Sequence, residues 1–179
     1  MLVKMKPSLA RTALAGVTGF VALVLALFLT FAKFGGSQRG QTGVLFDPAT
    51  QSPKLIAVWK EMSPLPLLIE APAVIFAGYL AFAIGHAFLF RSVRAAWPPG
   101  IAHRGLRMAL IIWSSSAFFE LQGPVNLFHQ PARPFAIALT FWAIAALAEA
   151  FAIVAVIERD RATVMRASAR SSSSGAMER

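Results

Sequence analysis

Four long apolar stretches make up most of this chain, and they constrain its fold more than any other feature. They cover approximately residues 12–34, 66–90, 106–121 and 134–157. A helix needs about 20 predominantly apolar residues to cross a hydrocarbon core about 30 Å thick. The sequence therefore predicts an all-α fold, an integral membrane bundle of four transmembrane helices.

The composition favours the lipid bilayer as the solvent for these helices. Hydrophobic residues make up 57% of the chain, more apolar surface than a soluble domain of 179 residues can bury. We expect one transmembrane domain over residues 1–160 and a disordered basic tail rich in Ser and Arg over 161–179. The chain contains no cysteine, which excludes disulfides and zinc or iron–sulfur sites with cysteine ligands.

The distribution of the 17 Lys and Arg residues predicts the orientation. Most of them precede the first stretch, lie between the second and third, or follow the fourth, and the fewer remaining ones lie in the other two loops. Loops rich in Lys and Arg stay in the cytoplasm. We therefore expect a multi-pass protein of the bacterial inner membrane with both termini cytoplasmic. The same pattern explains the net charge of +9 without a nucleic-acid partner.

The longest loop, residues 35–65, contains one amphipathic segment. Within residues 53–62, Leu55, Ile56, Trp59 and Met62 fall on one helical face. This spacing predicts a short helix lying in the outer membrane interface, with Trp59 at the level of the headgroups.

Small residues recur at helical spacing in three of the four stretches. Pairs separated by four residues let transmembrane helices approach closely. They occur in the first stretch as Thr12 with Gly16 and Ala15 with Gly19, in the second as Ala73, Ala77, Ala81 and Gly85, and the fourth repeats Ala138, Ala145 and Ala152 every seven residues. We expect these seams to pack helices within one chain or between copies.

Ionisable side chains within the bilayer cost about 2.5–3.5 kcal/mol on insertion scales, so each one is a candidate functional residue. At the outer end we expect one polar cluster, formed by Glu70, Glu120, Asn126 and His129. It could bind a ligand or share a proton. Alternatively, Glu120 pairs with Arg133 or Lys60, and Glu70 is hydrated at the interface.

A second group, deeper in the membrane, consists of His86, Tyr79 and Glu149. The predicted helix ends place the levels of His86 and Glu149 about 6 Å apart, a gap that long side chains or a water molecule could bridge. Two interpretations remain open: a hydrogen bond that joins two helices, or a proton relay or substrate contact.

No established catalytic motif is present. The sequence contains neither a Gly-rich phosphate-binding loop nor an H-E-x-x-H zinc motif. Only His86 lies inside a predicted span, so a pair of haem-ligating histidines is missing. The Ser114–Ser116 run has no nearby histidine, which favours hydrogen bonding between helices over nucleophilic catalysis. We therefore assign no catalytic residue, metal or cofactor.

The segment 118–128, Phe-Phe-Glu-Leu-Gln-Gly-Pro-Val-Asn-Leu-Phe, follows a loop that contains Trp97-Pro98. With this loop, it resembles small four-span bacterial membrane proteins that have no assigned activity. The resemblance covers most of the chain and implies the four-span architecture. It implies no catalytic residue.

The leading functional expectation is an accessory or assembly subunit that binds partners in the bilayer, either another membrane protein or a second copy of the chain. The alternative is a small proton-coupled transporter or carrier that uses Glu70, Glu120 and Glu149. A third hypothesis is an enzyme acting on a lipid, with Glu120 and His129 as acid and base.

Overall fold

The computed structural model describes the backbone of residues 8–38 and 41–174, and the side chains of these residues up to Arg159. All regular elements in the described ranges are helices. The long ones are α1 (Leu9–Leu27) with its π-helical continuation η1 (Phe28–Phe34), α4 (Pro72–Val93) with the 3-10 turn η2 (Arg94–Ala96), α5 (Ile101–Glu120) with the π-helical η3 (Leu121–Val125), and α7 (Ala132–Ser174). The short ones are α2 (Pro53–Lys60), α3 (Leu67–Glu70) and α6 (Asn126–Phe128).

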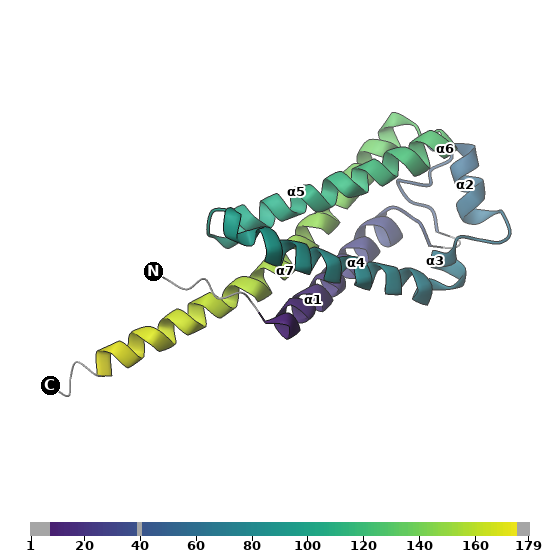
Figure 1. Cartoon of the computed structure of the whole chain (residues 1–179). Helices are drawn as coiled ribbons and strands as arrows, with labels where there is room; N and C mark the ends of the chain where they lie inside the picture. The colour runs from purple at the N-terminus through teal and green to yellow at the C-terminus, as the bar shows by residue number, and fades with distance from the viewer. Residues whose placement is uncertain (1–7, 39–40, 175–179) are drawn as a thin grey trace.

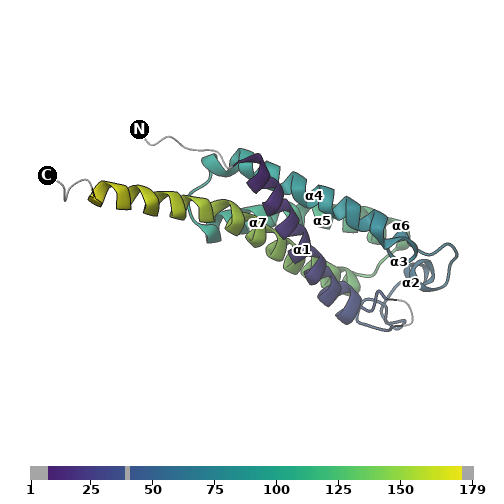
Figure 2. The same cartoon turned by 90° about the horizontal axis from the view of Figure 1, so that it is seen from below.

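The four long helices form an elongated bundle (Figure 1). α7 packs against both α1 and α5, and α1 packs against α4. The short helices α2, α3 and α6 gather at one end of the bundle, which we call the loop end (Figures 1 and 2). α1 begins at the opposite end, the terminal end, and there α7 extends past the other helices (Figure 2).

Three helices are long and apolar enough to cross a membrane: Leu9–Phe34, Pro72–Ala96 and Ala132–Arg159. The structure therefore supports a helical membrane protein with three such helices. α5 is not among them, and its sequence contains two arginines and three serines. It nevertheless packs along α7 as a member of the same bundle.

The predicted second span begins six residues too early. Residues 66–71 do not join α4; Leu67–Glu70 form the separate short helix α3 instead. The break lies at Ala71, whose φ of −139° and ψ of 61° are not helical. Pro72 explains it, because proline disfavours a helical conformation in the preceding residue and suits the first turn of a new helix. α4 then continues past the predicted end at Phe90.

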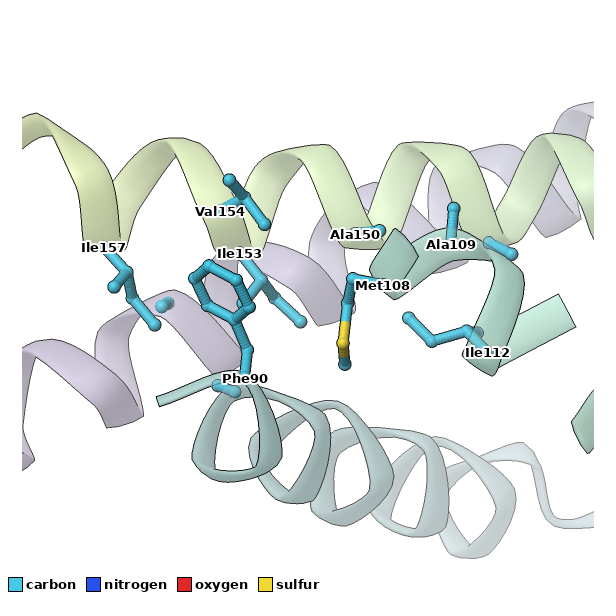
Figure 3. Packing of buried hydrophobic residues seen from close by; sticks show 11 residues of the cluster. Phe90, Met108, Ala109, Ile112, Ala150, Ile153, Val154 and Ile157 are labelled. Carbon is cyan, nitrogen blue, oxygen red and sulfur yellow. The ribbon is translucent and has the colours of Figure 1, made fainter. Parts of the chain in front are cut away.

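The main hydrophobic core lies toward the terminal end, where α1, α4, α5 and α7 converge. Figure 3 shows Phe90 reaching from α4 toward Ile153 and Val154 of α7, with Met108 of α5 beside it. All four side chains are fully buried.

Glycines bring α1 close to both of its neighbours, as the small-residue pairs predicted. A Cβ atom on Gly16 would lie 2.6 Å from Cα of Ile84 in α4. A Cβ atom on Gly19 would lie 2.6 Å from Cγ1 of Ile153 in α7. Thr12 and Ala15 are buried at the same crossings. Any larger residue at Gly16 must push two backbones apart.

The small-residue stripe of α4 behaves differently, because it faces away from the rest of the chain. Its four members are all exposed: Ala73, Ala77, Ala81 and Gly85. A Cβ atom added to Gly78 or Gly85 would meet no atom within 4 Å. This stripe therefore packs against nothing within the described part of the chain.

The amphipathic segment forms the short helix α2, as predicted. Its apolar face packs against the bundle: Leu55 is buried with Phe46 and Ala138, and the ring of Trp59 contacts that of Phe46 at a centroid distance of 5.8 Å. Lys60 fixes the preceding loop, since its Nζ donates hydrogen bonds to the carbonyls of Gly36, Gln38 and Gln41. This packing buries the part of the apolar face around Leu55, whereas Met62 lies beyond the end of α2 and is exposed.

The backbone of α7 is helical as far as Ser174. The side chains after Arg159 and all of residues 175–179 lie outside the described part of the chain, and the disorder expected for the tail, residues 161–179, stays a prediction.

Candidate functional site

The structure brings His86 and Glu149 together in the interior of the bundle. Nδ1 of His86 lies 2.8 Å from Oε1 of Glu149, within hydrogen-bonding distance. Glu149 is 1% exposed and His86 is 9% exposed. The ring of Phe82, one turn earlier on α4, covers the imidazole edge-to-face at a centroid distance of 4.6 Å. The pair is therefore shielded from the surroundings of the bundle.

The apolar helix that carries His86 continues to Ala96, past the predicted end of its span, and α7 continues past Ile157. The 2.8 Å contact joins the two side chains directly, without a bridging molecule, although the predicted helix ends had placed them at different depths.

Gly19 of α1 makes room for this pair. A Cβ atom there would lie 2.6 Å from Cγ1 of Ile153 and 3.4 Å from Cγ of Glu149, so the glycine lets α1 approach α7 closely beside the carboxylate side chain. Three helices thus build the site: α4 supplies the imidazole, α7 the carboxylate and α1 the cover.

Tyr79 does not join this pair. It packs with Leu23, Ala26 and Ala145 nearer the loop end, two helical turns from His86 along α4. The predicted group of three therefore reduces to a pair of titratable side chains.

Glu120 forms a second polar site near the loop end. Its Oε2 accepts a hydrogen bond from Nε1 of Trp142 at 3.0 Å, and the side chain of Gln130 hydrogen-bonds the same carboxyl group. Glu120 and Gln130 are both buried. Three elements meet here, since Glu120 ends α5, Trp142 lies on α7 and Gln130 lies in the short connection between them.

The other candidates at this end have different surroundings. Glu70 is exposed, and its Oε1 accepts a hydrogen bond from the backbone N–H of Leu65. Asn126 and His129 are exposed near the end of α6, where His129 has a positive φ of 54°. Among the described contacts, none joins these side chains to Glu120. Sequence reasoning thus identified Glu120, but it missed Trp142 and Gln130 as its partners.

A cavity of about 430 Å³ lies beside Glu120. It is bounded by α1 with η1, by α3 and α4, by the loop and α2, and by α7. Its wall is mostly apolar, and Glu120, Gln130, Gln51 and Tyr79 are its principal polar members. Small-molecule sites typically occupy about 300–1,000 Å³ and combine an apolar wall with a few placed polar groups.

The terminal end carries two buried arginines, Arg94 and Arg104, and the half-buried Arg11. Arg104 of α5 donates to Oε1 of Glu158 at 2.6 Å and to the carbonyls of Pro98 and Trp97 at 3.1 Å. A nitrogen of Arg94 lies 3.7 Å from the same carboxylate oxygen. Arg11 donates to the carbonyl of Val156. These residues counted as loop charges in the sequence, yet in the structure they join α1, η2 and α5 to α7.

No family model, curated protein or solved structure matches this chain. The described residues also contain no group of three His, Asp or Glu side chains that could hold a metal ion.

Proposed function

We propose that this chain is an accessory or assembly subunit of the bacterial inner membrane, which binds the transmembrane helix of another polypeptide along α4. The observation that carries the proposal is the exposed small-residue stripe Ala73–Ala77–Ala81–Gly85. Comparable small residues in α1 and α7 are buried against neighbouring helices. In lipid, van der Waals packing between small-residue faces drives helix association, so the exposed stripe favours an intermolecular contact.

The proposal includes α5 as a fourth span, which leaves both termini in the cytoplasm. Several polar groups in the interior of α5 are satisfied within the protein, which lowers the cost of placing it in a bilayer. The hydroxyls of Ser114, Ser115 and Ser116 each donate to a carbonyl four residues earlier in the same helix. Nε1 of Trp113 donates to the carbonyl of Leu139 in α7. The serines thus bond within α5, whereas the sequence had suggested bonds between helices.

Thiol labelling tests this topology, because the chain contains no cysteine of its own. In intact cells, a membrane-impermeant maleimide should label Ala49→Cys and Pro131→Cys, which flank the loop end. It should spare Ala102→Cys at the start of α5 until the membrane is opened. If Pro131→Cys is protected together with Ala102→Cys, α5 does not span and the topology is wrong.

Photo-crosslinking tests the α4 contact. A benzophenone attached to the thiol of Ala81→Cys should form a discrete protein adduct in native membranes. The matched control is Leu110→Cys on the exposed face of α5, which should crosslink only to lipid. Adding Ala77→Leu should abolish the Ala81→Cys adduct, because the bulky side chain separates the two helices.

The adduct's mass distinguishes the partners, since a second copy adds 19.2 kDa. The accessory-subunit proposal fails if the Ala81→Cys and Leu110→Cys proteins give the same products, or if Ala77→Leu leaves the adduct unchanged.

A second candidate function, a small proton-coupled carrier, is favoured by the His86–Glu149 pair. Buried carboxylate and imidazole groups in hydrogen-bonding contact are the components of proton relays in membrane transporters. Glu120 provides a further carboxyl group nearer the loop end.

Proton flux tests this candidate without knowledge of a substrate. Purified protein is reconstituted into vesicles that contain a pH-sensitive dye, and a potassium diffusion potential is applied. If the protein is a carrier with a proton leak, vesicles that contain it should acidify faster than protein-free vesicles. Glu149→Gln should slow this acidification. Equal rates for wild type, Glu120→Gln, Glu149→Gln and protein-free vesicles contradict a proton leak through this path.

A further inference from the structure

The cavity beside Glu120 has a polar part, which contains a carboxyl group as well as hydroxyl and amide side chains: Glu120, Ser37, Tyr79, Gln38, Gln51 and Gln130. One oxygen of Glu120 accepts from Trp142, and its carboxyl group remains part of the cavity wall. Gln130 also lines the cavity and is 7% exposed. Its Oε1 makes no hydrogen bond within the described residues, and this atom is closed off from the cavity space. Glu120 is therefore the carboxyl group that the cavity wall presents.

The remaining wall of the cavity is apolar and aromatic. It includes Phe31, Phe46, Leu55 and Ala138. Two of its members, Phe28 of η1 and Phe76 of α4, are among the exposed large apolar side chains of the chain, at 44% and 38% exposure. Both lie in helices that are apolar enough to span a membrane. One side of the cavity is therefore bounded by side chains that face lipid.

We propose that this cavity binds a single-chain lipid whose polar end is a hydrogen-bond donor, a long-chain alcohol or amine. The apolar chain occupies the space among the aromatic residues, and the hydroxyl or ammonium group donates to the carboxyl group of Glu120. A fatty-acid carboxylate would place further acceptor oxygens and a buried charge beside the carboxyl group of Glu120, which is unfavourable in a buried site. The inference concerns a separate site and does not depend on the α4 contact.

The intrinsic tryptophans can report occupancy, because two of the four line the cavity. Trp59 and Trp142 line it, whereas Trp97 and Trp113 do not. Brominated chains quench tryptophan on contact. The probes are 9,10-dibromooctadecanol, 9,10-dibromooctadecylamine and 9,10-dibromostearate, each titrated at pH 8 into detergent-solubilised protein carrying Trp97→Phe and Trp113→Phe.

We expect saturable quenching by the alcohol and the amine. The probe concentration at half-maximal quenching, the midpoint, should be at least fivefold lower for each of them than for the stearate. Ala138→Leu places a larger side chain in the cavity and should raise both midpoints at least fivefold. Ala136→Leu is the matched control, because Ala136 is exposed on the same helix outside the cavity wall, and it should leave them unchanged. Glu120→Gln should weaken amine binding more than alcohol binding.

The proposal is overturned if all three probes quench alike and without saturation, since that describes partition into micelles. It is also overturned if Ala138→Leu and Ala136→Leu behave identically.

A second measurement avoids the tryptophan substitutions. Octadecanol carrying a photoreactive diazirine near its middle is crosslinked to the wild-type chain. The label should be found in peptides covering residues 24–31, 68–79 or 120–142, and excess octadecanol should compete for it. Labelling spread evenly over the exposed apolar residues, with no competition, would contradict the site.

Discussion

His86 Nδ1 and Glu149 Oε1 lie 2.8 Å apart, and this contact joins α4 to α7 through the interior of the bundle. α4 otherwise packs chiefly against α1 and makes few contacts with α7. The pair therefore fixes the position of α4 relative to the helix that contacts most of the bundle. The pair thus contributes to the packing of α4 on α7, whether or not it also transfers protons.

Replacing either member of this pair should destabilise the protein. Hydrogen bonds between transmembrane helices contribute about 0.6 kcal/mol on average and up to about 1.7 kcal/mol. For a fully buried pair we expect a coupling energy at the upper end of this range. It is measured by a double-mutant cycle of His86→Leu and Glu149→Gln in denaturant unfolding in detergent. Additive effects of the two substitutions would show that the contact contributes no stability.

Gly16 should tolerate no side chain. Gly16→Ala places its Cβ 2.6 Å from the backbone of Ile84, and we expect a loss of about 1–3 kcal/mol from the separation of α1 and α4. Gly78→Ala is the control, because it meets open space and alanine is the better helix former by about 1 kcal/mol. The midpoint temperature of thermal unfolding in detergent should fall for Gly16→Ala and rise for Gly78→Ala. A shift in the same direction would mean that the α1–α4 crossing adjusts freely.

Arg104 should not be replaceable by lysine. Its guanidinium donates in three directions, to Glu158 and to two carbonyls, and a lysine ammonium cannot reproduce this planar geometry. We expect Arg104→Lys to lower stability by about 1–3 kcal/mol. Arg107→Lys on the exposed side of the same helix should change it by less than about 0.5 kcal/mol. Equal unfolding midpoints for the two variants would contradict a structural role for the Arg104 network.

Lys60 should hold the loop between η1 and α2 closed. Lys60→Met removes the donor shared by three loop carbonyls, so amide hydrogen exchange around residues 34–46 should accelerate. Lys54→Met is the matched control on the same helix, because its Nζ bonds to the carbonyl of Leu127 instead. If both substitutions accelerate exchange over 34–46 equally, the effect comes from α2 as a whole.

For the candidate residues, the sequence could predict that some side chains are buried in the protein, but not which partners they contact. Glu149 could be predicted to face protein, because it lies on the same side of its helix as the small-residue seam. Glu120 could be predicted to have a partner, because it is an ionisable group near a helix end within an apolar stretch. The identity of that partner could not be predicted. Trp142 meets Glu120 only because α5 and α7 are packed side by side, and Gln130 only because the connection between them folds back. Glu70 lies exposed on the short helix α3, apart from Glu120, because Pro72 breaks the expected helix at Ala71.

By itself the sequence determined the helical class, the apolar character of three membrane-length helices and the close packing of α1 at its glycines. Each of these follows from local composition and from the helical period of about 3.6 residues. Both can be recognised within the sequence of a single helix. Only the tertiary structure decided that the small-residue stripe of α4 faces outward, that His86 reaches Glu149 and that a cavity opens beside Glu120. These features depend on the rotation and relative depth of separate helices, and those are set by contacts between residues far apart in the chain.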